Sequence, residues 1–218
     1  MKTISEAMNW RYSTKEFDAN KRISDEDFSQ LKDILHLQAS SVNIQPWYYI
    51  IADDDAGKRR MTKGTQDIFE MNKNKLLDCS HVVLFATRVY ADDAYLETIL
   101  EQEDKDGRFA KEEYKTQMHQ GRKMFLDIHR YNKLNEAHWM GKQVYLSMGA
   151  LLLGAGLLGI DAVPMEGVDI QALDEEFGLN EKGYTTVGLV ALGYRNDNDI
   201  NATLPKSRLP KDLVFSKA

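Results

Sequence analysis

Residues 144–160 read VYLSMGALLLGAGLLGI, and this apolar stretch decides which fold classes are open to the chain. Its 17 residues fall short of the roughly 20 that a membrane-spanning helix needs, and Ser147 and four glycines interrupt them. A helical pattern runs through the stretch, from about residue 137 to residue 158. We therefore predict a long helix buried in a core or an interface, and no membrane span.

The same stretch contains GAGLLG at residues 154–159, which matches the GxGxxG fingerprint of dinucleotide-binding folds. That fingerprint follows a strand and opens a helix, whereas here it closes a helical pattern and precedes IDAVP. Small residues that let helices pack closely, with Gly159 as the helix C-cap, explain the pattern better. We do not expect a Rossmann fold.

The rest of the chain predicts a helix-rich domain around a small sheet. Apolar residues recur at helical spacing after the capping-box-like Ser24, in residues 24–38. Short β-branched and aromatic runs predict strands at residues 47–52, 81–87 and 185–192. Further helical patterns occupy residues 66–77, 93–103 and 111–129. The class is α/β or α+β, and without a linker or a repeat we expect residues 1–218 to form a single domain.

Composition excludes several classes of protein. Hydrophobic residues make up 43% of the 218 residues and charged residues 28%, which is typical of a folded chain rather than a disordered one. The formal net charge is −6, so a nucleic acid would not be attracted. Residues 198–218 contain Pro205 and Pro210 and no helical period, which predicts an extended arm over a surface, with a second copy as a possible partner.

The cysteine and histidine content and the absence of catalytic motifs in the sequence exclude further classes of function. Cys79 is the single cysteine, so an internal disulfide and a multi-cysteine zinc site are excluded, and a buried structural thiol is the preferred interpretation. The five histidines form no HExxH motif, and neither a GxSxG elbow nor a P-loop is present. We expect no metal. Glu6 falls where an export signal needs an apolar region, which favours a cytoplasmic protein.

Cations on short polar segments remain as candidate binding residues. Arg11, Ser13 and Lys15 alternate, and on an extended chain such residues point to one side. Lys206 and Arg208 repeat this spacing. Each segment could offer two cations and a hydroxyl to one phosphate, or could simply be a solvated surface. The segment SSVNIQPW, residues 40–47, could recognise the edge of a heterocycle or be an ordinary loop.

Seven collinear segments resemble the flavin-dependent nitroreductase family, specifically the oxygen-insensitive NAD(P)H nitroreductase and dihydropteridine reductase type. They are RYSTKEFD (11–18), SSVNIQPW (40–47), NKNKLLDCSHVV (72–83), QEDKDGRFA (102–110), KQVYLSMG (142–149), DAVPMEG (161–167) and NATLPKSRLP (201–210). The resemblance implies a nitroreductase-like fold with a small, mostly antiparallel sheet surrounded by helices. It also implies a homodimer with long helices at the interface, C-terminal arms that wrap the partner, and one FMN in each of two interface sites.

The resemblance also implies roles for individual residues. The FMN phosphate would be held by Arg11, Ser13, Lys206 and Arg208, and Tyr12 stands where relatives often have histidine, beside the ribityl chain. The pyrimidine edge of the flavin would meet Lys15, Asn72 and Lys75, and its N5 atom would face the turn formed by Pro164, Glu166 and Gly167. Gln143 would neighbour the ring or the ribityl chain. The flavin would also be reached from the other subunit, by Ser40, Ser41, Asn43 and Gln45. Arg108 and Phe125 would lie near NAD(P)H or the substrate.

The activity that follows is two-electron reduction of nitroaromatics and quinones. NADH or NADPH would give a hydride to flavin N5 and leave before the acceptor binds, which is a ping-pong reaction without a side-chain acid or base. Glu166, Gly167 and Lys15 would support that chemistry. The same site would serve an NAD(P)H-flavin reductase or a dihydropteridine reductase. A non-catalytic FMN-binding module is the alternative from another class.

Overall fold

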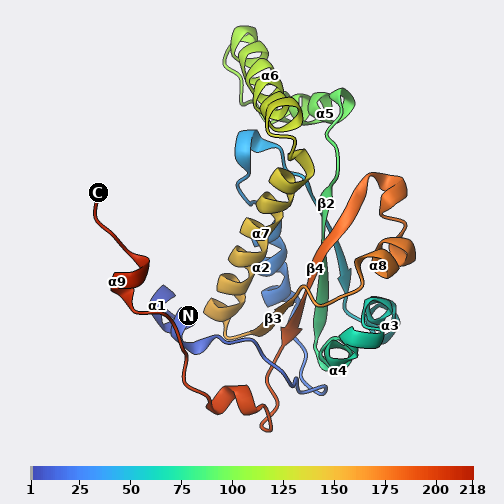
Figure 1. Cartoon of the computed structure of the whole chain (residues 1–218), viewed down its shortest axis with the longest axis vertical. Helices are drawn as coiled ribbons and strands as arrows, with labels where there is room; N and C mark the ends of the chain where they lie inside the picture. The colour runs from blue at the N-terminus through green and yellow to red at the C-terminus, as the bar shows by residue number, and fades with distance from the viewer. Residues whose placement is uncertain (1) are drawn as a thin grey trace.

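The computed structural model describes residues 2–218, and a four-stranded antiparallel sheet lies at its centre (Figure 1). The strands are β1 (Trp47–Ala52), β2 (His81–Arg88), β3 (Asp161–Met165) and β4 (Tyr184–Gly193). Their order is β1-β2-β4-β3, and every neighbouring pair is antiparallel. The small antiparallel sheet that the resemblance implies is therefore confirmed.

The three strands expected from their apolar runs are present, and β3 is an addition. The sequence predicts no strand here and places only Pro164 of its five residues in a turn, because the run is short and contains a proline. Proline cannot donate to a sheet ladder, so it is tolerated in an edge strand such as this one. The predicted turn begins after the strand, at Glu166.

Helix α7 (Glu136–Leu158) contains the apolar stretch and packs on one face of the sheet. Its buried side chains, Val144 and Leu151 among them, contact Val83 and Phe85 of β2. The helix ends at Gly159, whose φ of 76° is the left-handed C-cap that the sequence predicts. The core-helix interpretation is confirmed, and within the described residues no helix is long and apolar enough to span a membrane.

The GxGxxG segment lies where α7 meets two other helices, as its interpretation as a packing motif requires. A Cβ at Gly154 would stand 2.1 Å from Ile34 of α2 (Asp25–His36). A Cβ at Gly156 would touch Ala7 of α1 (Ile4–Trp10), 3.5 Å from its carbonyl oxygen. Close helix packing, and not dinucleotide binding, explains this motif.

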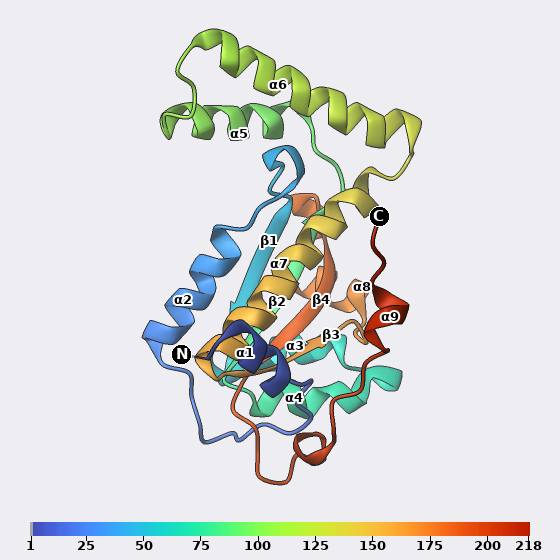
Figure 2. The ribbon, with the colours of Figure 1, turned by 90° about the vertical axis from the view of Figure 1, so that its left-hand side faces the viewer.

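The opposite face of the sheet is covered by α3 (Asp55–Met61), α4 (Lys73–Asp78) and α8 (Ile170–Phe177), so the sheet lies between two helical layers (Figure 2). Two short 3₁₀ turns, Thr62–Gly64 and Asp67–Asn72, lie between α3 and α4. A third, Asn180–Lys182, lies between α8 and β4. The helix expected over residues 66–77 is therefore divided between a 3₁₀ turn and α4. Alternate residues of β2 face the two layers, with Val82 on one side and Val83 on the other.

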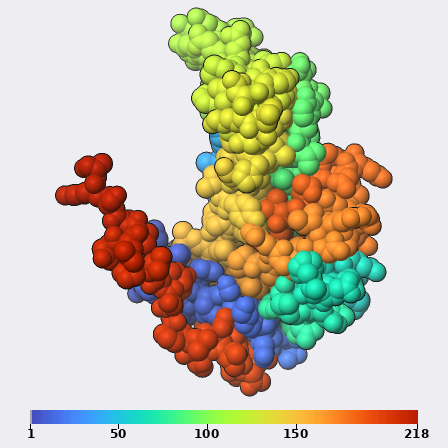
Figure 3. Space-filling view, in the orientation of Figure 1, coloured from blue at the N-terminus to red at the C-terminus, as the bar shows by residue number. Residues whose placement is uncertain are grey.

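Two further parts extend from this body. Helices α5 (Asp93–Lys105) and α6 (Glu112–Asp127) form a hairpin beyond one end of the sheet (Figures 1 and 2). A π-helical turn, Ile128–Asn132, joins α6 to α7. After β4 the chain forms a largely extended arm that projects from the body (Figure 3). Two short helical segments interrupt the arm, Ile200–Thr203 and α9 (Lys211–Val214), which corrects the fully extended prediction.

Two buried polar groups in the core are well defined. Cys79 is 1% exposed, and burial raises the pKa of its thiol to about 12, so the interpretation as a structural thiol is confirmed. His81 stacks on Phe28 with 3.9 Å between ring centroids. Its Nδ1 lies 2.9 Å from Ser80 Oγ, which itself accepts from the backbone N–H of Ile23. The Ser80 hydroxyl therefore links the His81 ring to the backbone of Ile23.

His81 predicts a loss of stability in mild acid. Burial, helped by the charge of Arg22, lowers its pKa from 6.5 to about 4. Between these two pH values the unfolded chain binds a proton that the folded chain does not, so stability falls as the pH decreases through this window. We expect His81→Gln to remove a pH-dependent loss of up to about 3 kcal/mol, measured by urea denaturation from pH 7 to pH 4. The exposed His36→Gln is the matched control, and an equal slope in both variants would contradict the assignment.

Candidate functional site

The cation-bearing segment that starts at Arg11 runs extended from the end of α1 along β3. Arg11 has φ −70° and ψ 142°, and Ser13 forms a parallel bridge with Ala162 of β3. Thr14 is fully buried, while Lys15 is exposed. The extended course that the two-residue spacing requires is present.

A buried carboxylate fixes this segment. Asp199 is 1% exposed, and its Oδ2 accepts the backbone N–H of Lys15 at 2.9 Å and the Tyr12 hydroxyl at 3.2 Å. Asn201 donates to the carbonyl of Ser13 at 3.0 Å. Burial raises the pKa of Tyr12 to about 12, so its hydroxyl stays protonated and donates. The start of the C-terminal arm is thereby tied to the Arg11 segment.

Three cations then meet without an acidic partner. Lys206 Nζ donates to the carbonyl of Arg11, and Arg11 Nε is buried with no hydrogen-bond partner within residues 2–218. Burial and the charge of Arg208 lower the pKa of Arg11. Burial, Arg11 and Arg208 lower the pKa of Lys206. Because each lowered pKa records a charged form that lacks compensation, this cluster is suited to bind an anion.

A second group joins Lys15 to the turn after β3. Lys75 Nζ donates to Asn72 Oδ1 at 2.9 Å and to the carbonyl of Met71 at 2.6 Å. Burial and the charge of Lys15 lower the pKa of Lys75. Asn72 Nδ2 in turn donates to the carbonyl of Gly167 at 2.8 Å. Two ammonium groups, an amide and a glycine turn therefore lie together.

The turn after β3 is also held through Glu166. The hydroxyl of Tyr145, on α7, donates to Glu166 Oε1. Burial raises the pKa of Tyr145 to about 12, and the hydrogen bond to Glu166 adds to the rise. Beside this pair lies an apolar hollow of about 450 Å³, lined by Tyr145, Met148, Gly149, Leu152, Pro164 and Glu166.

Residues 40–45 form a strained loop between α2 and β1. Val42, Asn43 and Gln45 have φ values of 49°, 54° and 45°, a region that non-glycine residues avoid. Such conformations cost about 1–3 kcal/mol each and persist only where the surroundings impose them. The backbone N–H of Ser41 donates to Gln143 Oε1 at 2.9 Å. Gln143 therefore lies with this loop of its own chain.

The structure does not bring every candidate residue to one place in a single chain. Arg108 is exposed in the turn between α5 and α6, and Phe125, 45% exposed, lies near the other end of α6. At about 1.5 Å per residue, the part of α6 from Glu112 to Phe125 alone is roughly 20 Å long. No hydrogen bond joins the Arg11 cluster to the 40–45 loop within residues 2–218.

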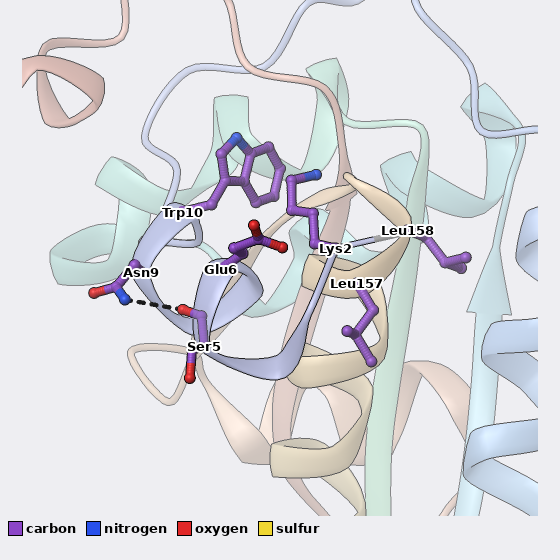
Figure 4. Close-up of a pocket in the computed structure, with 7 residues that line it drawn as sticks. All are labelled: Lys2, Ser5, Glu6, Asn9, Trp10, Leu157 and Leu158. Atoms are coloured by element: carbon purple, nitrogen blue, oxygen red, sulfur yellow. Dashed lines mark hydrogen bonds between the residues drawn. The ribbon is translucent and has the colours of Figure 1, made fainter.

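A large surface hollow contains none of the candidate residues. It is an open groove of about 880 Å³ between α1 and the end of α7 (Figure 4). Its polar groups already have partners: Lys2 lies 4.2 Å from the ring centroid of Trp10, Asn9 bonds the carbonyl of Ser5, and Glu6 caps its own helix. Across residues 2–218, no group of three or more His, Cys, Asp or Glu side chains is arranged to hold a metal.

Several residues at the site were not in the predicted set. Asp199, Asn201 and Tyr145 are polar residues in unremarkable sequence, and only the fold shows that they hold the candidate residues. An aspartate seven residues before Lys206 and nine before Arg208 carries no signal of its own in a loop that reads NDNDINAT.

The fold is that of the nitroreductase family. Residues 8–194 match the model of the Nitroreductase family, and the chain belongs to it. The resemblance that the sequence carries is thereby confirmed.

The chain is also similar to individual proteins. The chain is 46% identical to the oxygen-insensitive NAD(P)H nitroreductase of Enterobacter cloacae and 45% identical to that of Salmonella typhimurium, over 100% of each chain. It is 35% identical to the major NAD(P)H-flavin oxidoreductase of Aliivibrio fischeri, over 91% of this chain and 90% of the relative. A candidate nitroreductase of Exiguobacterium sibiricum, crystallised with FMN, shares the fold with a TM-score of 0.82 and 23% identity, over 100% of this chain and 98% of that one.

The carboxylate of Asp199 generates a prediction for the site. Asp199→Asn replaces a carboxylate that accepts from three backbone N–H groups and a tyrosine hydroxyl. We expect the free energy of unfolding to fall by about 1–3 kcal/mol, because buried partners lose their acceptor. Chemical denaturation measures it. Asp197→Asn, an exposed neighbour, should change stability by less than about 0.5 kcal/mol, and equal effects would show that Asp199 does not anchor the segment.

Proposed function

We propose that this chain is an FMN-dependent NAD(P)H oxidoreductase that reduces nitroaromatics and quinones by two-electron steps. The uncompensated cluster of Arg11, Lys206 and Arg208 is the observation that carries the proposal. Membership of the nitroreductase family and 46% identity to an oxygen-insensitive NAD(P)H nitroreductase support it. The proposal assigns the cofactor as FMN and the electron donor as NADH or NADPH.

The cation cluster fits the phosphate of FMN. Arg11 Nε is a buried donor without a protein acceptor, and Lys206 and Arg208 supply further donors beside it. A phosphate dianion would relieve the repulsion among the three cations and accept their hydrogen bonds. Ser13, on the same extended segment, would add a hydroxyl. Tyr12 would contribute its backbone beside the ribityl chain, since its hydroxyl is already bound to Asp199.

The second group fits the pyrimidine edge of the isoalloxazine ring. Bound FMN would supply the hydride chemistry, accepting a hydride from NAD(P)H at N5 and passing two electrons to the acceptor. Lys15 and Lys75 would stabilise the negative charge that reduction places on that edge. Asn72 links them to the Gly167 carbonyl. The turn of Pro164, Glu166 and Gly167 would present a backbone N–H to N5, and no side-chain acid or base is assigned.

A second copy of the chain would complete the site. Within one chain, the loop that carries Ser40, Ser41, Asn43 and Gln45 is not joined to the Arg11 cluster, and Gln143 stays with that loop. Large apolar side chains are exposed on the outer face of α7 and along the arm: Leu146 58%, Leu204 61%, Leu209 70%, Leu213 70% and Phe215 72%. Exposed apolar surface of this extent marks an interaction site. We propose a homodimer in which each loop, with Arg108 and Phe125 near the substrate or NAD(P)H, serves the partner's flavin.

A second candidate function uses the same site. The 35% identity to an NAD(P)H-flavin oxidoreductase favours reduction of free flavin, and a dihydropteridine would need no other cofactor chemistry. A non-catalytic FMN-binding module is the further alternative. We place the protein in the cytoplasm and assign it small-molecule substrates, with neither nucleic acid nor membrane as a partner.

A visible spectrum tests the proposed function. The purified protein should be yellow, with FMN near one per chain, and its flavin band should bleach on anaerobic addition of NADH or NADPH. Addition of a nitroaromatic or menadione should restore the band. A band that neither nucleotide bleaches would reduce the protein to a binding module, and a colourless protein that cannot be reconstituted with FMN would overturn the proposal.

The phosphate role predicts a separation of cofactor binding from stability. We expect the double variant Lys206→Ala, Arg208→Ala to bind FMN at least tenfold more weakly, because two of three cations are lost. Its free energy of unfolding without FMN should change by less than about 1 kcal/mol, since exposed cations add little to folding. Fluorescence titration and denaturation measure the two quantities. Lys211→Ala with Lys217→Ala removes two charges from the same arm as a control, and equal FMN affinity in both double variants would exclude the phosphate role.

A further inference from the structure

The strained loop of residues 40–45 is bound from the outside by side chains of the α5–α6 hairpin. The hydroxyl of Tyr95, on α5, donates to the carbonyl of Ile44 at 2.9 Å and to that of Gln45 at 2.6 Å. Arg122 Nε, on α6, donates to the carbonyl of Val42 at 2.9 Å. Three carbonyls of the loop, those of Val42, Ile44 and Gln45, are therefore satisfied by the hairpin. Figure 2 shows this loop directly beneath α5.

A buried ion pair connects the two hairpin helices to the loop. Arg122 Nη2 lies 2.7 Å from both carboxylate oxygens of Glu103, and the two side chains are 0% and 4% exposed. Glu103 also accepts the side-chain amide of Asn43 at 2.8 Å. One guanidinium and one carboxylate thus join α5, α6 and the loop. Because burying two charges is costly, a pair in this position requires a reason beyond stability.

The loop is also part of the hairpin's apolar core. Ile44 is fully buried and packs with Leu96, Ile99 and Leu126 of the hairpin, and Val42 lies against the same cluster. The bonds inside the loop are few: Gln45 N–H to Ser40 Oγ, Gln45 Nε2 to the carbonyl of Asn43 at 3.4 Å, and two backbone bonds to the carbonyls of Ser40 and Ser41. These do not account for left-handed φ values at Val42, a β-branched residue, and at Asn43 and Gln45.

We propose that the α5–α6 hairpin is the template that holds the 40–45 loop in its left-handed conformation, with Arg122, Glu103 and Tyr95 as positioning residues for FMN recognition. The FMN part rests on the proposed function, because it assigns Ser40, Ser41, Asn43 and Gln45 to the flavin. The template part rests on the contacts alone. In this proposal Arg122, Glu103 and Tyr95 contact the loop and not the cofactor. The hairpin orders the cofactor site by holding the loop.

Two surface ion pairs of the hairpin join its helices to each other and not to the loop. Lys115 bonds Asp104 at 2.7 Å and Lys123 bonds Asp93 at 2.6 Å, each joining α6 to α5 at the surface without a contact to the loop. Arg122 differs because its Nε reaches past α5 to the loop backbone. It lies one turn before Phe125 on the same helix.

Amide hydrogen exchange on the FMN-free protein tests the template directly. Tyr95→Phe removes one hydroxyl without changing the buried volume, and Arg122→Met removes the guanidinium. We expect protection of the Asn43, Ile44 and Gln45 amides to fall at least tenfold in both variants, while β2 amides keep theirs. Lys123→Met, one residue along α6, is the control and should leave loop protection within twofold. Unchanged loop protection in Tyr95→Phe and Arg122→Met would overturn the template.

FMN affinity tests the positioning role. We expect about a tenfold weaker affinity in Tyr95→Phe and Arg122→Met, and an affinity within twofold of the wild type in Lys123→Met. Leu31→Ala, in the core of α2, lowers global stability without contact to the loop and separates positioning from general destabilisation. If Leu31→Ala weakens FMN binding equally, or if FMN affinity is unchanged in Tyr95→Phe, the positioning role is wrong. Failure of the wild type to bind FMN would reject the proposed function, while hydrogen exchange would still decide the template.

Should Arg122→Met fail to fold, Tyr95→Phe decides the inference alone. The phenylalanine keeps the ring that stacks under Arg88, 3.8 Å from its centroid, and loses only the two bonds to the loop.

Discussion

Helix α7 lies against the sheet face formed by Val83, Phe85 and Val190, and its glycines let α1 and α2 approach on the other side. This close packing places the remaining parts of the site. Because α1 is held at Gly156, the chain leaves α1 at Trp10 and runs beside β3, which puts Arg11 within reach of the C-terminal arm. The same helix presents Tyr145 to the turn after β3 and Gln143 to the 40–45 loop.

The sequence was sufficient for elements whose pattern is local. The β2 run HVVLFAT and the long apolar helix ended by Gly159 carry their own signals, and both were predicted within a residue or two. The seven-residue helices α1 and α3 are too short for a helical period to be distinguished from a loop. Strand β3 was missed because Pro164 breaks the strand pattern, and only its edge position makes the proline acceptable.

The residues of the candidate site also differ in whether a local sequence pattern predicts them. The spacing of the cations Arg11, Lys15, Lys206 and Arg208 predicts a phosphate-binding chemistry, but not that residues nearly two hundred positions apart are neighbours. The resemblance to a family supplied that association, and the contact of Lys206 with the Arg11 carbonyl provides its geometry. Asp199 and the Arg122–Glu103 pair were beyond prediction. Their roles depend on burial, and a charged residue in a loop or on a helix is exposed in most sequences.

The cation cluster also sets an order of events during synthesis. Arg11 belongs to the first part of the chain to be made, whereas Lys206 and Arg208 follow every strand of the sheet. The sheet, α7 and the hairpin can all form while the cluster is still incomplete, because none of them needs the arm. An anion gains its full set of cations only after the chain has been synthesised past residue 208. Under the proposed function, the phosphate of the ligand would therefore meet its full set of cations only after all four strands have been synthesised.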